Sequence, residues 1–265
     1  MLYTVDGLVL RVQNHGENDR LITILTANGK INALCHGARS LKSKMANLTQ
    51  PFVYGNFEIN KRSGALPWVR GGSTNEVFYG LREGVEKMFL ATYICDVASE
   101  LSGEGVDCSE ILRLTLNTLY AIMTDMRPIS QIKAAFELRA AAISGYRPDV
   151  LRCEDCGTEN TENTYFDVMN GAIVCSACLE GRGAGLGKKY SSVYDDVRER
   201  SVLVPLNPAS LSAIRFVLYS LQEKIYSFSL ALDEDLRMFA RAGEEYLLNH
   251  LGHGFDSLDL YYSMI

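Results

Sequence analysis

The first 80 residues alternate apolar and polar positions with the period of two that is typical of β-strands. Near the N-terminus, Leu10 and Val12 fall on one face of such a strand and Val9 on the other. Asn28-Gly29 predicts a tight hairpin, because both residues tolerate positive φ. Strands are expected over residues 2–12, 21–25, 30–36, 52–60 and 66–74. Five short strands in so short a segment predict a small β-barrel, since closure removes exposed sheet edges.

From residue 81 onward the apolar positions recur at the spacing of three and four residues that marks an amphipathic helix. Helices are predicted over residues 81–101, 109–126, 130–144, 208–222 and 233–251. Gly145 and Gly252 follow two of these helices, where a glycine in the left-handed conformation commonly ends a helix. Pro208 suits the first turn of another. The chain therefore changes from β to α near residue 80.

Four cysteines lie in two pairs between the third and fourth predicted helices. Cys153 and Cys156 form one Cys-x2-Cys pair, and Cys175 and Cys178 form the other, with 18 residues between the pairs. This spacing is typical of a tetrahedral zinc site, because a gap of two residues lets both thiolates reach one ion at about 2.3 Å. The four cysteines are therefore predicted to bind one structural Zn²⁺.

A hairpin is predicted between the two cysteine pairs, because Asn170 and Gly171 separate two short apolar runs. Each Cys-x2-Cys turn is here called a knuckle. Two knuckles joined by a hairpin make a zinc ribbon, which is too small to fold without its metal. The alternatives are a redox-active pair, a catalytic zinc and a thiol cluster without metal. A redox pair needs a βαβ context that the sequence lacks, and a catalytic zinc keeps one position open, whereas four thiolates close the shell. Cys35, Cys95 and Cys108 are expected to be plain core or surface thiols.

Charge divides the chain at the same place as the hydrophobic pattern. The whole chain has a net charge of −6, which argues against a protein that coats nucleic acid indiscriminately. Residues 1–80, however, hold nine Lys and Arg against five Asp and Glu. A basic front half on an acidic body favours nucleic-acid binding, although ordinary surface variation would also produce so modest an excess.

A small barrel with basic loops is an architecture that binds single-stranded nucleic acid. The first candidate for phosphate contact is the polar loop that carries Arg39, Lys42 and Lys44. Further candidate cations lie on a turn or within strands: Arg11, Lys30, Lys61, Arg62 and Arg70. Four strand aromatics are candidate stacking platforms: Phe52, Tyr54, Phe57 and Trp68. At period-two spacing such residues more often form the core of a barrel.

The sequence contains no catalytic constellation. It lacks the phosphate-loop, dinucleotide-binding and nucleophile-elbow motifs. The glycine run at residues 181–187 has no strand before it and is interpreted as a linker. The protein is therefore not expected to be an enzyme. Neither a secretory signal nor a transmembrane segment is predicted, so a cytoplasmic location is expected.

Several short motifs follow one another in the N-terminal part of the chain. They are Gly16-Glu17-Asn18-Asp19-Arg20-Leu21, Leu25-Thr26-x-x-Gly29, His36-Gly37-Ala38-Arg39 with Lys42-Ser43, and Leu48-x-x-Pro51-Phe52. In this order, and together with the four cysteines, they resemble the RecO family of bacterial DNA repair proteins. The similarity continues to Leu247-x-x-x-Leu251 and so covers essentially the whole chain.

The resemblance implies an N-terminal OB-fold and a helical domain that carries the zinc module. The fold class is accordingly predicted as α+β, with a five-stranded OB-fold β-barrel followed by an α-helical domain with an inserted four-cysteine zinc ribbon. The OB-fold domain is placed at residues 1–80 and the helical domain at residues 81–265, with the ribbon at about 150–180.

The resemblance also implies a function. The family members act as recombination mediators and strand-annealing factors that bind single- and double-stranded DNA. The implied partners are RecR and single-stranded DNA-binding protein, and the implied outcome is the loading of RecA, in the cytoplasm and in association with the nucleoid. The matched loop residues Arg39, Lys42 and Lys44 would contact DNA. The alternative, from the residues alone, is a zinc-ribbon adaptor that binds RNA or protein partners in transcription.

Overall fold

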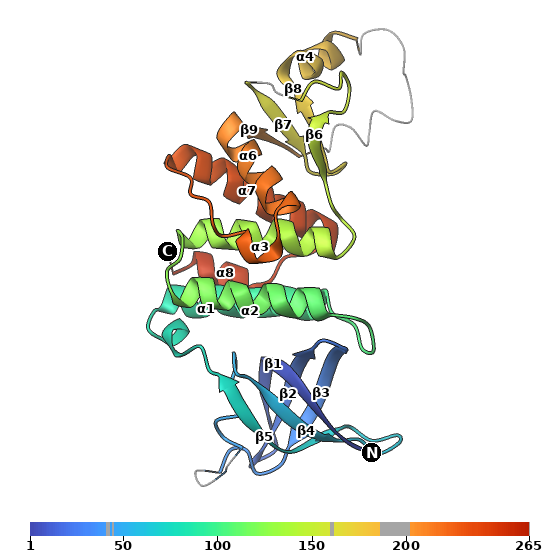
Figure 1. The fold of residues 1–265 in the computed structure, drawn as a ribbon, viewed down its shortest axis with the longest axis vertical. Coiled ribbons are helices and arrows are strands. Elements are labelled where there is room, and N and C mark those ends of the chain that lie inside the picture. The colour runs from blue at the N-terminus through green and yellow to red at the C-terminus, as the bar shows by residue number, and fades with distance from the viewer. Residues whose placement is uncertain (41–42, 44, 160–161, 186–201, 265) are drawn as a thin grey trace. The chain divides into compact units, whose positions relative to one another are not determined.

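Two compact units make up a computed structural model of the chain, which describes residues 1–40, 43, 45–159, 162–185 and 202–264 (Figure 1). The first unit comprises Met1–Met126 together with Phe255–Ile265, and the second comprises Arg127–Gly254. Residue 80, where the expected OB-fold domain ends, lies inside the first unit.

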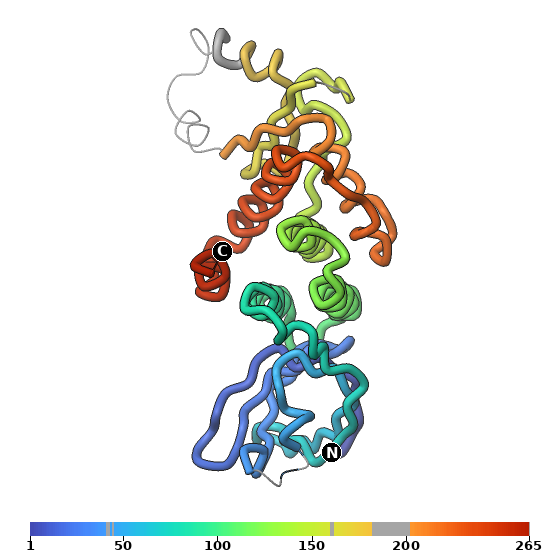
Figure 2. The backbone as a smooth tube through the Cα atoms, turned by 90° about the vertical axis from the view of Figure 1, so that its left-hand side faces the viewer, coloured from blue at the N-terminus to red at the C-terminus, as the bar shows by residue number. Residues whose placement is uncertain are grey.

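The first unit begins with a closed five-stranded barrel. Its strands are β1 (Leu2–His15), β2 (Asp19–Thr26), β3 (Gly29–Cys35), β4 (Tyr54–Asn60) and β5 (Trp68–Glu76). They close in the order β1-β2-β3-β5-β4, and every pair is antiparallel except β3 and β5, which pair in parallel at Leu34 and Trp68. Figure 2 shows the β1–β2 hairpin, in blue, extending from the ring of strands. A five-stranded Greek-key barrel of this kind is an OB-fold, so the predicted fold class is confirmed.

The inward-facing residues of β1 differ from the predicted set. Between Val9 and Arg11 the pairing with β2 shifts by one residue, so Leu10 is a β-bulge. An extra residue reverses the alternation of faces beyond it. Val9 and Val12 therefore both pack in the barrel core, while Leu10 is buried away from that cluster. The prediction that Leu10 and Val12 share a face was wrong, because periodicity alone does not detect an inserted residue.

Helices complete the first unit. The 3₁₀ turn η1 (Tyr79–Arg82) precedes α1 (Val85–Glu100) and α2 (Ser109–Met123), and the unpredicted helix α8 (Asp256–Tyr262) joins them from the end of the chain. Helix α1 contacts β1, α2 and α8. Two polar contacts fasten the barrel to α1, because Lys30 Nζ donates to the carbonyl of Ser99 at 2.7 Å and Arg11 pairs with Asp96 at 2.8 Å.

The second unit contains the helices α3 (Ile129–Ile143), α6 (Pro208–Tyr219) and α7 (Asp233–Leu251), with the 3₁₀ turn η2 (Gln222–Lys224). These helices begin and end within a few residues of the predicted bounds. Gly145 and Gly252 adopt φ of 95° and 75°, as expected of glycines that end helices. Helix α3 packs on α7 so closely that a Cβ added to Gly243 would lie 3.0 Å from the carbonyl oxygen of Ala134.

A four-stranded sheet carries the cysteine segment. Its strands are β6 (Asp149–Cys153), β7 (Thr164–Asp167), β8 (Ala172–Cys175) and β9 (Leu203–Leu206), in the order β6-β8-β7-β9. The predicted hairpin joins β7 to β8 at Gly171, whose φ is 62°. The hairpin is not isolated, because β9 pairs with β7 and helix α7 contacts β9.

Helix α4 (Ser176–Gly185) follows β8 directly. The interpretation of residues 181–187 as a linker is therefore wrong for residues 181–185, and residues 186–187 lie outside the described part of the chain. Glycine disfavours helix by about 1 kcal/mol per residue. Gly181, Gly183 and Gly185 nevertheless lie within α4. Among the described helices, none has the length and apolar character that crossing a membrane requires.

Candidate metal centre and nucleic-acid interface

The four predicted cysteine ligands come together at one end of the four-stranded sheet. Cys153 is the last residue of β6 and Cys175 the last of β8, and these two strands are parallel neighbours that end at the same edge. Cys156 and Cys178 follow in the turn and in the helix after each strand. The four sulfur atoms lie within 4.8 Å of one another.

The spacing of these sulfur atoms fits a tetrahedral metal ion. Cys156 Sγ lies 3.8 Å from Cys175 Sγ. Two thiolates bound at about 2.3 Å to a tetrahedral ion are separated by about 3.8 Å. Sulfur donors favour soft or borderline ions such as Zn²⁺ over hard cations. The donor set and its geometry are therefore those of a closed thiolate site.

Hydrogen bonds favour negative charge on some of these sulfur atoms and disfavour it on Cys178. The amides of Cys175 and Cys178 donate to Cys153 Sγ and Cys175 Sγ, each at 3.4 Å. Hydrogen bonding with Thr158, whose hydroxyl oxygen lies 3.3 Å from the sulfur, lowers the pKa of Cys156 to about 6. Hydrogen bonds with Cys175 and Cys156 favour the protonated thiol of Cys178 and so raise its pKa, and the nearby charge of Cys153 raises it further. A cation would offset this repulsion.

Arg215 of helix α6 holds the backbone on both sides of the first cysteine pair. Its Nε donates to the carbonyl of Val150 at 2.7 Å, and its Nη2 donates to the carbonyls of Leu151 and Glu159 at 2.8 Å each. A guanidinium that binds three carbonyl groups fixes the approach to the knuckle. Sequence reasoning missed this residue, because an arginine within a predicted helix carries no signal of a distant backbone partner.

The predicted DNA-contact loop begins beside the β1–β2 turn. Arg39 is exposed, and its guanidinium donates to the carbonyl of Gly16 at 2.9 Å. Its backbone N–H donates to the carbonyl of Asn18 at 3.0 Å. Lys42 and Lys44 lie outside the described residues. Of the three predicted loop cations, the structure thus places Arg39, fastened to the neighbouring turn.

Asp19 fastens the start of the same loop. Its carboxylate accepts a hydrogen bond from the amide of Gly37 at 2.8 Å and lies 2.9 Å from Nδ1 of His36. These two contacts, the Gly37 amide first, lower the pKa of Asp19. The carboxylate is therefore charged at neutral pH and orders the residues that lead to Arg39.

The other candidate cations fall into two groups. Lys61, Arg62 and Arg70 are exposed, whereas Arg11 and Lys30 have the protein partners described above. Arg62 lies over the ring of Trp68 at 5.0 Å from its centroid. The first group is therefore free to approach a phosphate, while the charges of the second group are already engaged.

The candidate stacking aromatics are mostly core residues. Phe57 is fully buried in the barrel cluster and Phe52 is 5% exposed, so neither ring presents a face to a ligand. Tyr54 is half-buried, and half-buried Trp68 carries Arg62. Tyr3, which the sequence analysis did not single out, packs on the barrel cluster and lines a pocket.

Comparison with known proteins decides which family these features belong to. The family model for the N-terminal domain of recombination protein O matches residues 1–78, and the model for its C-terminal domain matches residues 82–194. A DNA repair protein RecO from Myxococcus xanthus is 31% identical over 261 residues, which cover 97% of this chain and 96% of the relative. The chain belongs to the RecO family.

Two further RecO relatives match this chain over two thirds of its length or more. The protein from Acetivibrio thermocellus is 29% identical over 255 residues, 96% of this chain and 93% of the relative. The protein from Alkaliphilus metalliredigens is 32% identical over 179 residues, 67% of this chain and 72% of the relative. The resemblance carried by the short motifs is confirmed, and the C-terminal RecO match includes all four cysteines.

Proposed function

We propose that this chain is a DNA-binding recombination mediator and strand-annealing factor in bacterial recombinational DNA repair. The observation that carries the proposal is the OB-fold strand order of the barrel within the segment matched by the RecO N-terminal model. OB barrels bind single strands through a cationic groove and aromatic stacking. The relatives named DNA repair protein RecO support a role in repair. In this role the protein positions DNA and is not an enzyme.

The DNA contacts are proposed on the exposed cations of the barrel. Arg39, with Lys42 and Lys44 of the same loop, would contact phosphates, and Lys61, Arg62 and Arg70 would extend that surface. Arg11 and Lys30 are weaker candidates, because both side chains already bind groups of helix α1. The OB-fold domain at residues 1–80 is thus the proposed DNA-binding part, in the cytoplasm and at the nucleoid.

RecR and single-stranded DNA-binding protein are the proposed partners, with RecA loaded as the outcome. The acidic, apolar tail of single-stranded DNA-binding protein needs a pocket that is both basic and apolar. A pocket of about 280 Å³ between β9 and α7 has this character, with Val204, Pro205 and Met238 beside Arg237 and Arg241. Glu234 also lines it and would restrict how an acidic tail approaches. This pocket supports the second unit, expected within residues 81–265, as the partner-binding part.

The metal is proposed to be one structural Zn²⁺ held by Cys153, Cys156, Cys175 and Cys178. Four thiolates leave no open position for substrate or water, so the ion would supply shape and no reaction. Its proposed role is to hold the knuckles at the end of the β6–β9 sheet.

Fluorescence anisotropy with labelled single-stranded DNA across a salt series tests the DNA-binding proposal. Affinity is expected to fall as salt rises, because phosphate contacts release counterions. The double charge reversal Lys42→Glu and Lys44→Glu is expected to lower the slope of log affinity against log salt by about 1 for each lost contact. Charge reversal of the exposed Lys224, which lies in η2, serves as a control outside the barrel and is expected to leave the slope unchanged.

A strand-annealing assay without ATP then separates a mediator from a passive binder. The wild-type protein is expected to accelerate pairing of complementary strands, and the double reversal is expected to reduce that acceleration. Binding that is absent or independent of salt would contradict the DNA-binding proposal. Binding without acceleration of pairing would contradict the annealing role alone.

A further inference from the structure

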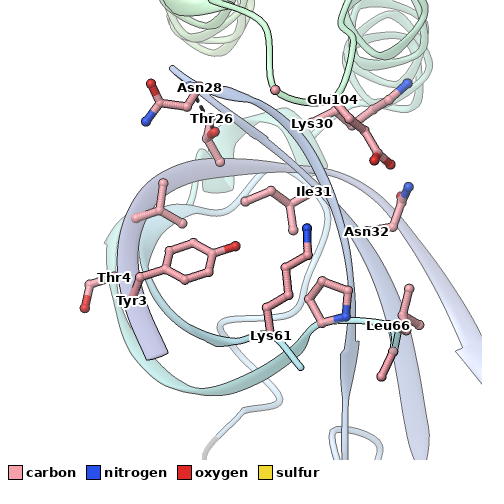
Figure 3. Close-up of a pocket in the computed structure, with 14 residues that line it drawn as sticks. Tyr3, Thr4, Thr26, Asn28, Lys30, Ile31, Asn32, Lys61, Leu66 and Glu104 are labelled. Atoms are coloured by element: carbon pink, nitrogen blue, oxygen red, sulfur yellow. Dashed lines mark hydrogen bonds between the residues drawn. The ribbon is translucent and has the colours of Figure 1, made fainter. Parts of the chain in front are cut away.

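One pocket of the barrel opens where β3 and β5 stop pairing. These two strands are paired at Leu34 and Trp68 alone, and the segment of residues 61–67 crosses the remaining gap. The resulting pocket has a volume of about 500 Å³ and is lined by β1, β3, that segment and residues 104–105 (Figure 3). Sites for small organic ligands have volumes of about 300–1,000 Å³. The pocket is therefore large enough for one nucleotide.

One wall of this pocket is an unpaired stretch of strand backbone. On this edge of β3, the amide of Lys30 donates to the carbonyl of Gly103 and the amide of Leu34 donates to the carbonyl of Pro67. Asn32 lies midway between them, so the period of two directs its N–H and C=O to the same side, toward the pocket. The described part of the chain offers these two groups no partner. A donor and an acceptor side by side match the Watson–Crick edge of any base.

The Asn32 side chain does not compete for this position. Its Oδ1 accepts a hydrogen bond from the hydroxyl of Thr23 at 2.8 Å, which holds the amide group on the neighbouring strand. The backbone edge is thus available while the side chain is fixed. Recognition by backbone alone tolerates different bases, as a mediator of general recombination requires.

Tyr3 of β1 and Lys61, which follows β4, both extend into the pocket (Figure 3). Tyr3 is half-buried and packs against the barrel cluster, so its ring is held in place and keeps one side toward the pocket. Lys61 is exposed, and its ammonium group has no ion pair or hydrogen bond within the described residues. Glu104, which also lines the pocket, is an exposed acid that would repel a phosphate.

We propose that this pocket binds one unstacked nucleotide of a single DNA strand, with its base on Tyr3 and against the backbone edge of Asn32, and its phosphate at Lys61. Base–aromatic stacking and lysine–phosphate contact are the two interactions by which OB barrels hold single strands. The inference rests on the proposed DNA-binding function and adds to it a base-binding position that is separate from the Arg39 loop.

The proposal is tested by measuring the binding of two labelled DNA strands. Each strand has about 12 nucleotides, a length within the site sizes of OB barrels. One strand is oligothymidine, and the other has the same backbone with abasic sugars. Tyr3→Leu, in the full chain, is expected to weaken binding to oligothymidine about tenfold and to leave binding to the abasic strand unchanged. Lys61→Gln is expected to weaken both strands alike and to lower the salt slope by about 1. Glu104→Gln is expected to strengthen both.

Tyr3→Phe is the matched control, because it keeps the ring and removes the hydroxyl, and it is expected to bind like the wild type. Wild-type affinity for the two strands gives a readout that is independent of how the Leu variant folds. Equal wild-type binding to oligothymidine and to the abasic strand would overturn the base pocket. An equal effect of Tyr3→Leu on both strands, in a protein with unchanged thermal melting, would overturn it too.

Failure of the pocket is distinguishable from failure of the proposed function. Salt-dependent binding that ignores the presence of bases rejects the pocket and leaves a phosphate-binding barrel. Absence of binding to either strand rejects both. A competition arm with thymidine monophosphate separates the two sources of a nucleotide. Displacement of the strand by the free nucleotide at equal concentration would overturn the assignment to a strand, and no displacement is expected.

Discussion

The barrel and the cysteine-bearing sheet are both small β-structures, but they are stabilised in different ways. The barrel closes on itself around an apolar cluster that includes Val9, Ile24 and Phe57. The cluster at the cysteine end of the β6–β9 sheet consists of little more than the cysteines, Val174 and Leu179. An apolar core stabilises a fold by removing surface from water, whereas adjacent thiolates repel one another without a cation. The barrel is therefore stabilised by its own apolar core, whereas the proposed Zn²⁺ would stabilise the two cysteine pairs.

The same sheet is better supported at its other end than an isolated zinc ribbon would be. Strand β9 adds to the hairpin, and the ring of Phe166 lies 5.1 Å from that of Tyr246 on α7. Phe166 and Val204 are fully buried. We therefore expect the metal to stabilise the knuckles locally, while helix packing retains the rest of the sheet.

Removal of the proposed metal is expected to have the largest effect, and to change the cysteine-bearing sheet but not the barrel. Apparent binding free energies in zinc-finger peptides are about 10–16 kcal/mol, and there they constitute the free energy of folding. Chelation or Cys153→Ser is expected to abolish amide exchange protection at the two knuckles, while β7, β9 and the barrel keep theirs. Cys108→Ser is the matched control, since Cys108 lies in the first unit, and it should retain the metal measured by mass spectrometry. Cooperative loss of all four strands would show that the ribbon folds through its metal alone.

A cavity in the barrel core tests whether the apolar cluster stabilises the barrel independently of the cysteine-bearing sheet. Phe57 is fully buried, and Phe→Ala changes in protein cores cost about 3–5 kcal/mol. Phe57→Ala is expected to lower the free energy of unfolding of the first unit by that amount in urea denaturation. The metal content should stay unchanged, because the cysteines lie in the second unit. Loss of metal in this variant would mean that the two regions fold as one.

The contact between the β7–β8 hairpin and α7 is tested by a smaller change. A Cβ at Gly171 would lie 2.7 Å from the hydroxyl of Tyr246, and the φ of 62° also disfavours any side chain. Gly171→Ala is expected to cost about 1–3 kcal/mol of stability. Gly252→Ala is the matched control, because its φ of 75° brings similar backbone strain with nothing within 4 Å of the Cβ. Equal losses in the two variants would mean that the Tyr246 contact contributes nothing.

The sequence predicted the fold well where a local signal reports the structure. Alternation located all five barrel strands, and the spacing of the cysteines predicted four residues that do meet in space. The predictions failed where the cause is not local. The bulge at Leu10 is invisible to a period of two, and β9 is too short to be found without its partner β7.

The candidate binding residues were harder to predict for the same reason. Tyr3 stands in an ordinary strand pattern, and its position in a pocket follows from the gap between β3 and β5. Charge alone ranked Lys30 with Lys61, yet the first binds the carbonyl of Ser99 and the second is free. Composition counts the charges of a surface, but only the fold shows which of them are already engaged.

Lowering the pH is expected to act differently on the barrel and on the cysteine-bearing sheet, and its expected effect is the smallest of the four. The folded pKa of Asp19 lies below its ordinary value of about 3.9, chiefly because the Gly37 amide donates to the carboxylate. These contacts are therefore fully present at neutral pH and are lost as the pH falls through the folded pKa. The Gly37 amide shift in nuclear magnetic resonance is expected to titrate below pH of about 3.9, with little change in global stability because the pair is exposed. Cysteine thiols must be deprotonated to hold a metal, so acid should release the proposed metal and loosen the two cysteine pairs at a higher pH than the barrel loop. A Gly37 midpoint above the ordinary carboxyl value would show that Asp19 does not fasten the loop.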